Sequence, residues 1–297
     1  MNKYTTRATI EGTSFFDTFI SVNKEGKKRL GIRFYRWLSV ILIHVVFILS
    51  YWVDLQVLEG TLSGSRFLGF HLIDPFMTLQ VFAAHHQIPI NLAIGTITIV
   101  IVYLLIGGRA YCSWVCPYTI LGEISEKWHQ TLVHKKIIKE RFFDYKIKYI
   151  FWSIFLVLAF FTGFLVFETF NIVGILSRAL IYGYSLALLF VVAVFLMDIF
   201  FSQRAWCRYV CPVGTTYSFI GWPSATKVVW DDRCDHCRVC SDVCLVPHVL
   251  EITKKNANVE NKKTVSIISG DCTLCGRCIE VCHTDALNYE TKLKKLI

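Results

Sequence analysis

Two runs of cysteines decide the fold of this chain: Cys234-Asp-His-Cys237-Arg-Val-Cys240-Ser-Asp-Val-Cys244 and Cys272-Thr-Leu-Cys275-Gly-Arg-Cys278-Ile-Glu-Val-Cys282. Each run has the spacing C-x2-C-x2-C-x3-C, which is typical of bacterial ferredoxins with two [4Fe–4S] clusters. In such proteins the fourth cysteine of each run binds the cluster of the other run. The spacing therefore predicts two ligand sets: Cys234, Cys237, Cys240 and Cys282 for cluster 1, and Cys272, Cys275, Cys278 and Cys244 for cluster 2.

Zinc sites and disulfide bonds are the alternatives for these cysteines. Zinc usually takes two C-x2-C pairs, which gives no reason for a further cysteine after three residues in both runs. Disulfides need an oxidising compartment, and the topology predicted below places all twelve cysteines on the reducing side of a membrane. The runs depart from the ferredoxin pattern at one point, because the usual proline after the fourth cysteine is replaced by Leu245 and His283.

The composition points to a membrane protein. Hydrophobic residues make up 54% of the 297 residues, which is too apolar for an ordinary soluble domain. The formal charge is +9, but the Lys and Arg residues crowd next to apolar segments, as in juxtamembrane anchors. The sequence has no stacking platform or basic recognition helix, so we expect no nucleic-acid partner.

Four apolar segments are each close to the ~20 residues that cross a bilayer. They are residues 37–53, 88–106, 149–167 and 179–197, and none contains Lys, Arg, Asp or Glu. Residues 108–148 carry eight Lys or Arg, whereas residues 54–87 and 168–178 carry one each. The positive-inside rule then predicts a multi-pass membrane protein with both termini in the cytoplasm, and the family resemblance described below implies that the membrane is the bacterial inner membrane.

A second cysteine pattern occurs twice in the apolar part. It reads Arg109-Ala-Tyr-Cys112-Ser-Trp-Val-Cys116-Pro117 and Arg204-Ala-Trp-Cys207-Arg-Tyr-Val-Cys211-Pro212, so we expect a hairpin that is used twice. Residues four apart share one face of a helix. If the two halves pack about a pseudo-twofold axis, the four thiols converge on a third cluster, another metal, or a pair of redox-active dithiols. Two buried structural thiol pairs are the alternative.

The predicted fold is an α-helical membrane protein with four transmembrane helices as two repeated hairpins, followed by an α+β ferredoxin-like domain. We expect a cytoplasmic N-terminal segment at residues 1–36. The membrane domain covers residues 37–222, and the two-cluster domain covers residues 223–297.

A cluster domain beside a membrane domain needs an electron source, and a lipid-soluble quinol is a natural one. Quinol oxidation releases protons, so it needs a base near the ring. Ionisable groups within or beside apolar segments are candidates by default. The candidates for this base are His71, Asp74, Glu168 and Asp198, although each alone also suits a structural or headgroup contact.

The chain resembles the NapH/MauN family of ferredoxin-type membrane proteins. The likeness rests on Asp74-Pro75-Phe-Met-Thr-Leu-Gln80, on both Cys-x3-Cys-Pro motifs, on Pro247-His248-Val-Leu250 and on Cys275-Gly-Arg-Cys278. It implies a membrane component of a quinol dehydrogenase that serves periplasmic nitrate reduction. Electrons from ubiquinol or menaquinol would pass through iron–sulfur clusters to a periplasmic iron–sulfur or cytochrome partner. The resemblance assigns cluster ligation to the eight cysteines of the two runs, and a quinol or electron-transfer role to the two shorter motifs.

Two other functions fit parts of this pattern. One is an assembly or maintenance factor for another membrane-linked redox enzyme, which would reduce a metal or a disulfide. The other is an iron–sulfur sensor, although no DNA-binding or signalling module supports it. The predicted topology conflicts with the quinol dehydrogenase function in one respect. It places the clusters in the cytoplasm, whereas the acceptor implied by the resemblance is in the periplasm.

Overall fold

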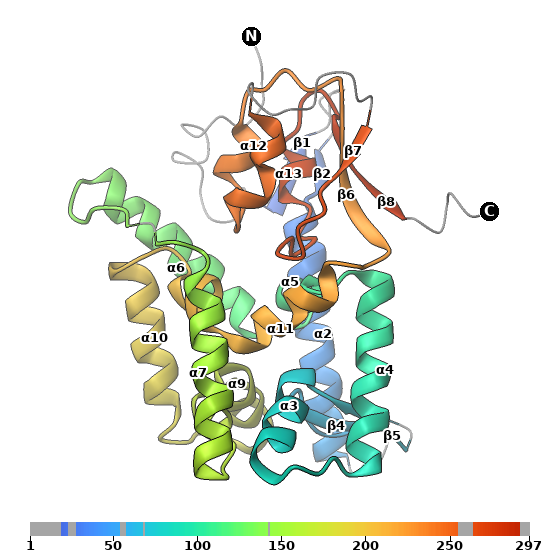
Figure 1. The fold of residues 1–297 in the computed structure, drawn as a ribbon. Helices are drawn as coiled ribbons and strands as arrows, with labels where there is room; N and C mark the ends of the chain where they lie inside the picture. Colours follow the sequence, from blue (N-terminus) through green and yellow to red (C-terminus); the bar gives the residue numbers. More distant parts are fainter. Residues whose placement is uncertain are drawn as a thin grey trace. The chain divides into compact units, whose positions relative to one another are not determined.

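The fold is described by a computed structural model for residues 19–22, 28–53, 58–67, 69–141, 143–254 and 264–291 (Figure 1). The chain forms two compact units. The ferredoxin-type unit comprises Met1–Leu38, Tyr103–Trp114 and Ser218–Ile297, and the helical unit comprises Ser39–Val102 and Val115–Tyr217. Segments from both ends and from the middle of the chain therefore contribute to the unit that holds the two cysteine runs.

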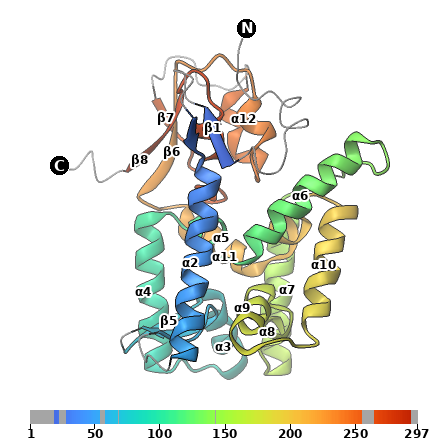
Figure 2. The same ribbon diagram turned by 180° about the vertical axis from the view of Figure 1, so that it is seen from behind.

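Apolar helices dominate the helical unit (Figure 2). Helix α2, Ile32–Trp52, is the one helix among the described residues that is long and apolar enough to cross a membrane. Four shorter apolar helices follow it: α4 (Ile90–Ile106), α7 (Ile147–Thr162), α9 (Ile172–Tyr182) and α10 (Leu188–Phe200). Many of their large apolar side chains are exposed, which is costly in water and favourable in lipid.

The third and fourth predicted apolar segments are not single helices. Helix α7 ends at Thr162, because Gly163 adopts a left-handed conformation with φ of 69°. The short helix α8, Val166–Phe170, follows it. The segment predicted at residues 179–197 is divided between α9 and α10, because the chain turns at Gly183, where φ is 99°. Glycine adopts such angles without the steric cost that other residues pay, so it ends both helices.

The connection between α2 and α4 is folded. Strands β3 (Leu58–Thr61), β4 (Gly64–Phe67) and β5 (Phe70–Ile73) form an antiparallel sheet in that order. Helix α3, Pro75–His85, follows β5 directly, with Asp74 as its N-cap. Phe76 is fully buried and its ring packs edge-on against Phe167, 5.4 Å away between centroids. This contact joins α3 to the chain after α7.

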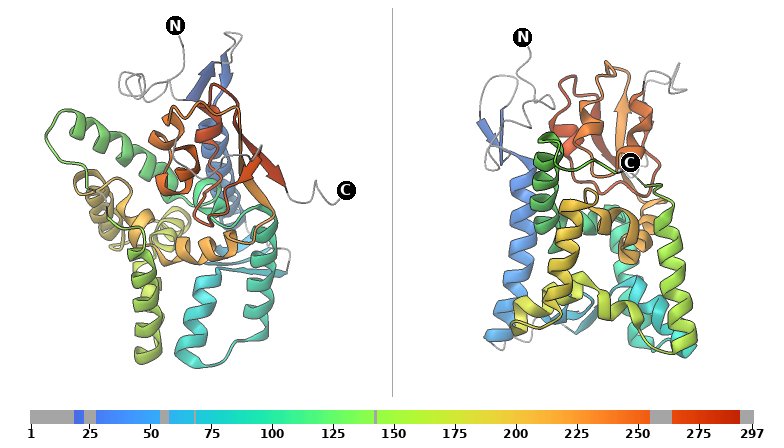
Figure 3. Two further views of the ribbon diagram at one scale, coloured as in Figure 1. Left: turned by 45° about the horizontal axis from the view of Figure 1, so that its top comes forward. Right: turned by 90° about the vertical axis from the view of Figure 1, so that its left-hand side faces the viewer.

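The ferredoxin-type unit has a small antiparallel sheet with strand order β7-β6-β8 (Figure 3). Its strands are β6 (Thr226–Asp231), β7 (Thr264–Ser266) and β8 (Leu287–Thr291). The short helices α12 (Val239–Asp242) and α13 (Arg277–Glu280) each lie within a cysteine run, and the 3-10 helix η3 spans Pro247–Thr253. A second short sheet pairs β1 (Ile20–Val22) with β2 (Lys28–Leu30). The α+β character predicted for this unit agrees with these elements.

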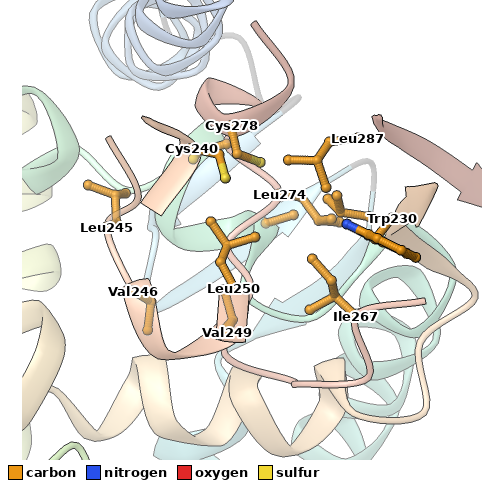
Figure 4. Close-up of a cluster of buried hydrophobic side chains, with 13 residues drawn as sticks. Trp230, Cys240, Leu245, Val246, Val249, Leu250, Ile267, Leu274, Cys278 and Leu287 are labelled. Carbon is orange, nitrogen blue, oxygen red and sulfur yellow. The ribbon is translucent and has the colours of Figure 1, made fainter. Parts of the chain in front are cut away.

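The core of this unit surrounds the second cysteine run. Figure 4 shows the buried side chains of Trp230, Leu250, Ile267, Leu274 and Leu287, which come from both the sheet and the loops. Three cysteines are buried in the same hydrophobic core: Cys240, Cys275 and Cys278. Burying these side chains contributes roughly 1.5–3 kcal/mol each, which helps to hold the loops that carry the cysteines.

Candidate metal centres

The two cysteine runs have the same backbone conformation. In each run, the residues before and after the second cysteine are left-handed: His236 (φ 59°) and Arg238 (φ 64°) in the first, Leu274 (φ 48°) and Gly276 (φ 72°) in the second. A one-turn helix then begins two residues after the second cysteine. Alternation of left- and right-handed residues curls a chain into a concave loop, a geometry common at iron–sulfur sites. The shared spacing therefore builds the same loop twice.

The first group of thiols gathers three cysteines of the first run and one of the second. Cys240 interacts electrostatically with Cys234, Cys237 and Cys282. This is the set predicted for cluster 1. The fourth cysteine of the second run thus lies with the first run, as the crossed pattern of two-cluster ferredoxins requires.

The second group has the complementary composition. Cys278 interacts with Cys272, Cys275 and Cys244, the set predicted for cluster 2. It also interacts with Cys240 of the first group, so the two groups are neighbours. A cavity is lined by Cys244, Cys272, Cys275 and Cys278 together with apolar side chains. Four soft sulfur donors around an apolar cavity suit an iron–sulfur cluster.

Cys240, Cys272 and Cys278 are neutral thiols until a metal displaces their protons. Burial raises the pKa of Cys240 to about 11 and that of Cys272 to about 11, and burial also raises the pKa of Cys278. The thiolate is the form that binds metal, so loading the sites must release protons.

Backbone N–H groups point at the fourth cysteine of each run. Val246 N donates to Cys244 Sγ at 3.4 Å, and Ala286 N donates to Cys282 Sγ at 3.3 Å. Hydrogen bonds to ligand sulfurs are among the factors that set cluster potentials.

The two groups differ in exposure. Cys275 and Cys278 of the second group are buried, whereas Cys237 of the first group is exposed. Beside Cys237, His283 Nδ1 lies 4.0 Å from the sulfur, and His283 Nε2 lies 2.8 Å from Asp235 Oδ2. His283 stands where ferredoxins usually have proline, so the departure seen in the sequence brings an imidazole to the first group.

The first Cys-x3-Cys-Pro motif contacts the second cysteine run. Cys112 lies on α5, Ala110–Trp114. Trp114 Nε1 donates to Leu274 O at 3.1 Å, and Arg109 Nη1 lies 3.2 Å from Asp271 Oδ1. Both side chains of this ion pair are almost fully buried. Arg109 therefore pairs with the carboxylate of Asp271, the residue directly before Cys272.

Asp271 is the centre of this contact. Besides Arg109, it accepts a hydrogen bond from Ser218 Oγ at 2.7 Å and lies 2.9 Å from His248 Nε2. Sequence reasoning did not single out Asp271 or Ser218. No local motif marks them, because their partners are distant in the chain.

The second motif is held by carboxylates of the helical unit. Arg204 Nε donates to Glu126 Oε2 at 3.0 Å, and Arg204 Nη2 lies 3.7 Å from Glu123 Oε1. Both glutamates lie on α6, Tyr118–His134, and are buried. Sequence reasoning missed them, although their spacing of three residues on a helix is a signal for one shared face.

Asp198 fixes the backbone beside Cys207. It accepts from Trp206 N at 3.2 Å and from Tyr118 Oη at 2.6 Å. Tyr118 also interacts electrostatically with Cys207. This candidate from the sequence therefore lies at the second thiol motif.

Neither motif presents its two cysteines on one continuous helix. Helix α5 ends at Trp114, before Cys116, and the π-helix η2, Trp206–Val210, ends before Cys211. Both terminal cysteines precede a proline, which disfavours helical backbone at the residue before it. The prediction of a shared helical face is corrected accordingly, and convergence of Cys112, Cys116, Cys207 and Cys211 stays a prediction.

The other quinol-site candidates lie near the β3–β5 sheet. Asp74 accepts from Phe76 N, and burial, with a contribution from the charge of Glu168, raises the pKa of Asp74 to about 7. Glu168 accepts from Asn171 Nδ2 at 3.1 Å. His71 lies on β5 opposite Arg66. Asp74 and Glu168 are therefore brought near each other.

Known protein families match three parts of the chain. A family described as "4Fe-4S binding domain" matches residues 88–136 and 183–229, each of which contains one Cys-x3-Cys-Pro motif. A "4Fe-4S dicluster domain" matches residues 233–286, which contain both cysteine runs. One family thus matches both halves of the internal repeat.

Several curated proteins are similar over most of their length. The ferredoxin-type protein NapH of Escherichia coli is 32% identical over 88% of this chain and 91% of the relative. NapH of Haemophilus influenzae is 29% identical over 91% and 95%. The methylamine utilization ferredoxin-type protein MauN of Paracoccus denitrificans is 34% identical over 75% and 76%. No solved structure matches the chain.

Proposed function

The chain belongs to the NapH/MauN family of ferredoxin-type electron-transfer proteins, and we propose on this basis that it is a membrane subunit that oxidises a quinol. The observation that carries the proposal is the contact of the first thiol motif with the second cysteine run, through Trp114 and Arg109. In this proposal the eight cysteines of the two runs hold two [4Fe–4S] clusters. When bound, such clusters accept and release single electrons.

We place the protein in the bacterial inner membrane with four crossings, as two hairpins. The length of α2, the shorter apolar helices and the excess of Lys and Arg at residues 108–148 support this placement. The interrupted fourth segment fits it as well, because broken helices are tolerated in membranes where neighbouring elements satisfy the freed backbone groups.

Asp198 is the proposed positioning residue for the redox step at the second motif. Oxidation of a quinol to a quinone gives up two electrons and two protons, so both need acceptors. Asp198 and Tyr118 form a short hydrogen bond beside Cys207, and both side chains are buried from water. Asp74 has a separate role as the cap of α3. We therefore expect proton transfer to depend on Asp198 more than on Asp74.

The proposed acceptor is a periplasmic iron–sulfur or cytochrome partner of a nitrate reductase system. The NapH relatives support it, but the MauN relative is similar to the same degree, at 34% against 32% identity. The name of that relative refers to methylamine utilization and not to nitrate. We therefore keep a second candidate function, the assembly or maintenance of another membrane-linked redox enzyme. That function would use electrons from the same clusters.

An EPR experiment separates these two functions. Anaerobically purified, oxidised protein is mixed with a menaquinol analogue and frozen for low-temperature spectra. The proposal expects a reduced-cluster signal that is lost in Cys112→Ser or Cys207→Ser. In Asp198→Asn the signal should form more slowly than in the matched control Asp74→Asn. A signal with dithionite but none with quinol would contradict quinol oxidation and favour the assembly function.

A further inference from the structure

We infer that electrons arrive at cluster 2 and leave from cluster 1, and that Trp114 and Arg109 are the positioning residues for arrival. The inference rests on the proposed function, since it needs the eight cysteines to hold two clusters. It goes further because it assigns a direction to the two sites. The two groups of thiols have different neighbours in the ferredoxin-type unit, and this difference carries the argument.

The second run is held against the segment that carries Cys112. Trp114 Nε1 donates to the carbonyl of Leu274, which lies between Cys272 and Cys275. Arg109 also forms an ion pair with Asp271, which is the residue directly before Cys272. Two independent contacts thus hold α5 on one cysteine loop. The ion pair of Arg109 is buried, and the hydrogen bond of Trp114 is partly buried.

The packing between these segments is close. A Cβ atom at Gly107 would clash with Leu274 Cδ1, and Gly107 has a φ of 122° that favours glycine. Leu274 itself is buried in the core of the unit. Residues 103–114 and the second run therefore form one packed body, which suits electron transfer over a short and fixed distance.

The first group has the features expected of a departure point. Cys237 is exposed, and the neighbouring Arg238 is exposed as well. Cys240 of this group interacts electrostatically with Cys278 of the second, so the two groups are neighbours. A one-electron redox protein on the same side of the membrane as the clusters can approach Cys237, whereas the second group has no exposed cysteine.

The experiment uses the full chain in detergent with both clusters loaded. Cys237→Ser first identifies which EPR signal belongs to cluster 1. In dithionite-reduced protein, a soluble paramagnetic lanthanide chelate should then enhance the relaxation of the cluster 1 signal, and affect cluster 2 much less. This measurement reads the exposure of each cluster without any quinol.

Trp114→Phe tests the arrival side. It keeps the ring and removes the N–H donor to Leu274, and the matched control Trp222→Phe changes an exposed indole of the same unit. With a menaquinol analogue, the cluster 2 signal should appear first in the unaltered protein. Trp114→Phe should slow it about tenfold, since small displacements of a positioned group cost up to ~100-fold. Reduction by dithionite should be unchanged, and Trp222→Phe should match the unaltered protein.

Each outcome decides between the inference and the proposed function. Equal action of the chelate on both clusters would overturn the inference, as would equal rates for Trp114→Phe and Trp222→Phe. If quinol reduces neither cluster in the unaltered protein, the proposed function fails instead. The chelate measurement then still decides which cluster is the exposed one.

Discussion

The two cysteine runs have one spacing and left-handed residues at the same positions around the second cysteine, yet that cysteine differs in exposure between them. The first run places Asp235 and Arg238 at the positions where the second has Thr273 and Gly276. Its second cysteine is exposed, whereas the corresponding Cys275 is buried. The comparison teaches that cysteine spacing sets which thiols come together, while the residues between the cysteines set how far each site is from solvent.

The sharpest test of this difference is at the left-handed residue after the second cysteine. A Cβ atom at Gly276 would clash with Ile32 Cδ1 and lie 2.8 Å from Tyr289 Oη, and φ is 72°. Left-handed backbone costs a residue with Cβ roughly 1–2 kcal/mol, and overpacking costs about 1–3 kcal/mol more. Gly276→Ala should therefore destabilise the protein and lose cluster 2, as measured by thermal unfolding and iron content.

The control is Arg238→Ala at the matching position of the first run. Arg238 already has a Cβ atom at a φ of 64°, and its side chain is exposed. Stability should change by no more than about 0.5 kcal/mol, and both clusters should be retained. If the two variants lose stability equally, the contrast in packing between the runs is wrong.

A smaller contrast is expected one residue before the second cysteine. Leu274 is buried in the core, whereas His236 is only partly buried. Leu274→Ala should destabilise the protein by about 2–3 kcal/mol, because the removed atoms leave a cavity. His236→Ala should cost less, although it loses the contact of Nδ1 with Thr253 O at 3.1 Å. Denaturant unfolding measures both, and a greater loss for His236→Ala would contradict the assignment of the core.

The spacing of the cysteines predicts two crossed ligand sets, and thiols within each predicted set interact electrostatically. Each cluster group contains the fourth cysteine of the other run, as the pattern requires. This works because the ligand order of a two-cluster ferredoxin depends on short loops with fixed geometry. Ligation itself stays a prediction. The internal repeat was also visible, because both motifs have Arg, Ala, Val, both cysteines and the proline at the same positions.

The sequence did not reveal the partners of the repeated arginines. Each arginine forms a buried ion pair, Arg109 with Asp271 and Arg204 with Glu126. Their partners lie 162 and 78 residues away, so no local pattern pairs either partner with its arginine. Hydropathy likewise predicted one helix at residues 179–197, because an apolar window cannot register the left-handed turn at Gly183.

The subtlest contrast is the residue after the fourth cysteine, where cluster 1 has His283 and cluster 2 has Leu245. The carboxylate of Asp235 lies beside Nε2 of the His283 imidazole. The other ring nitrogen, His283 Nδ1, lies 4.0 Å from Cys237 Sγ. When both ring nitrogens carry protons, Nε2 donates to Asp235 and Nδ1 faces Cys237 Sγ as a donor, and a donor beside a ligand sulfur favours the more negative, reduced state of a cluster. His283→Leu gives both clusters the same residue and should lower the potential of cluster 1 by up to about 60 mV, a tenfold change for one electron.

An EPR redox titration of both signals measures this shift. The potential of cluster 2 is the internal control, because Leu245 is unchanged and buried among apolar side chains. Asp235→Asn removes a negative charge beside cluster 1 and should raise its potential, in the direction opposite to His283→Leu. Equal shifts of both clusters would mean that His283 acts on the fold of the unit. A shift confined to cluster 1 would mean that a single residue outside the cysteine pattern distinguishes two otherwise equivalent sites.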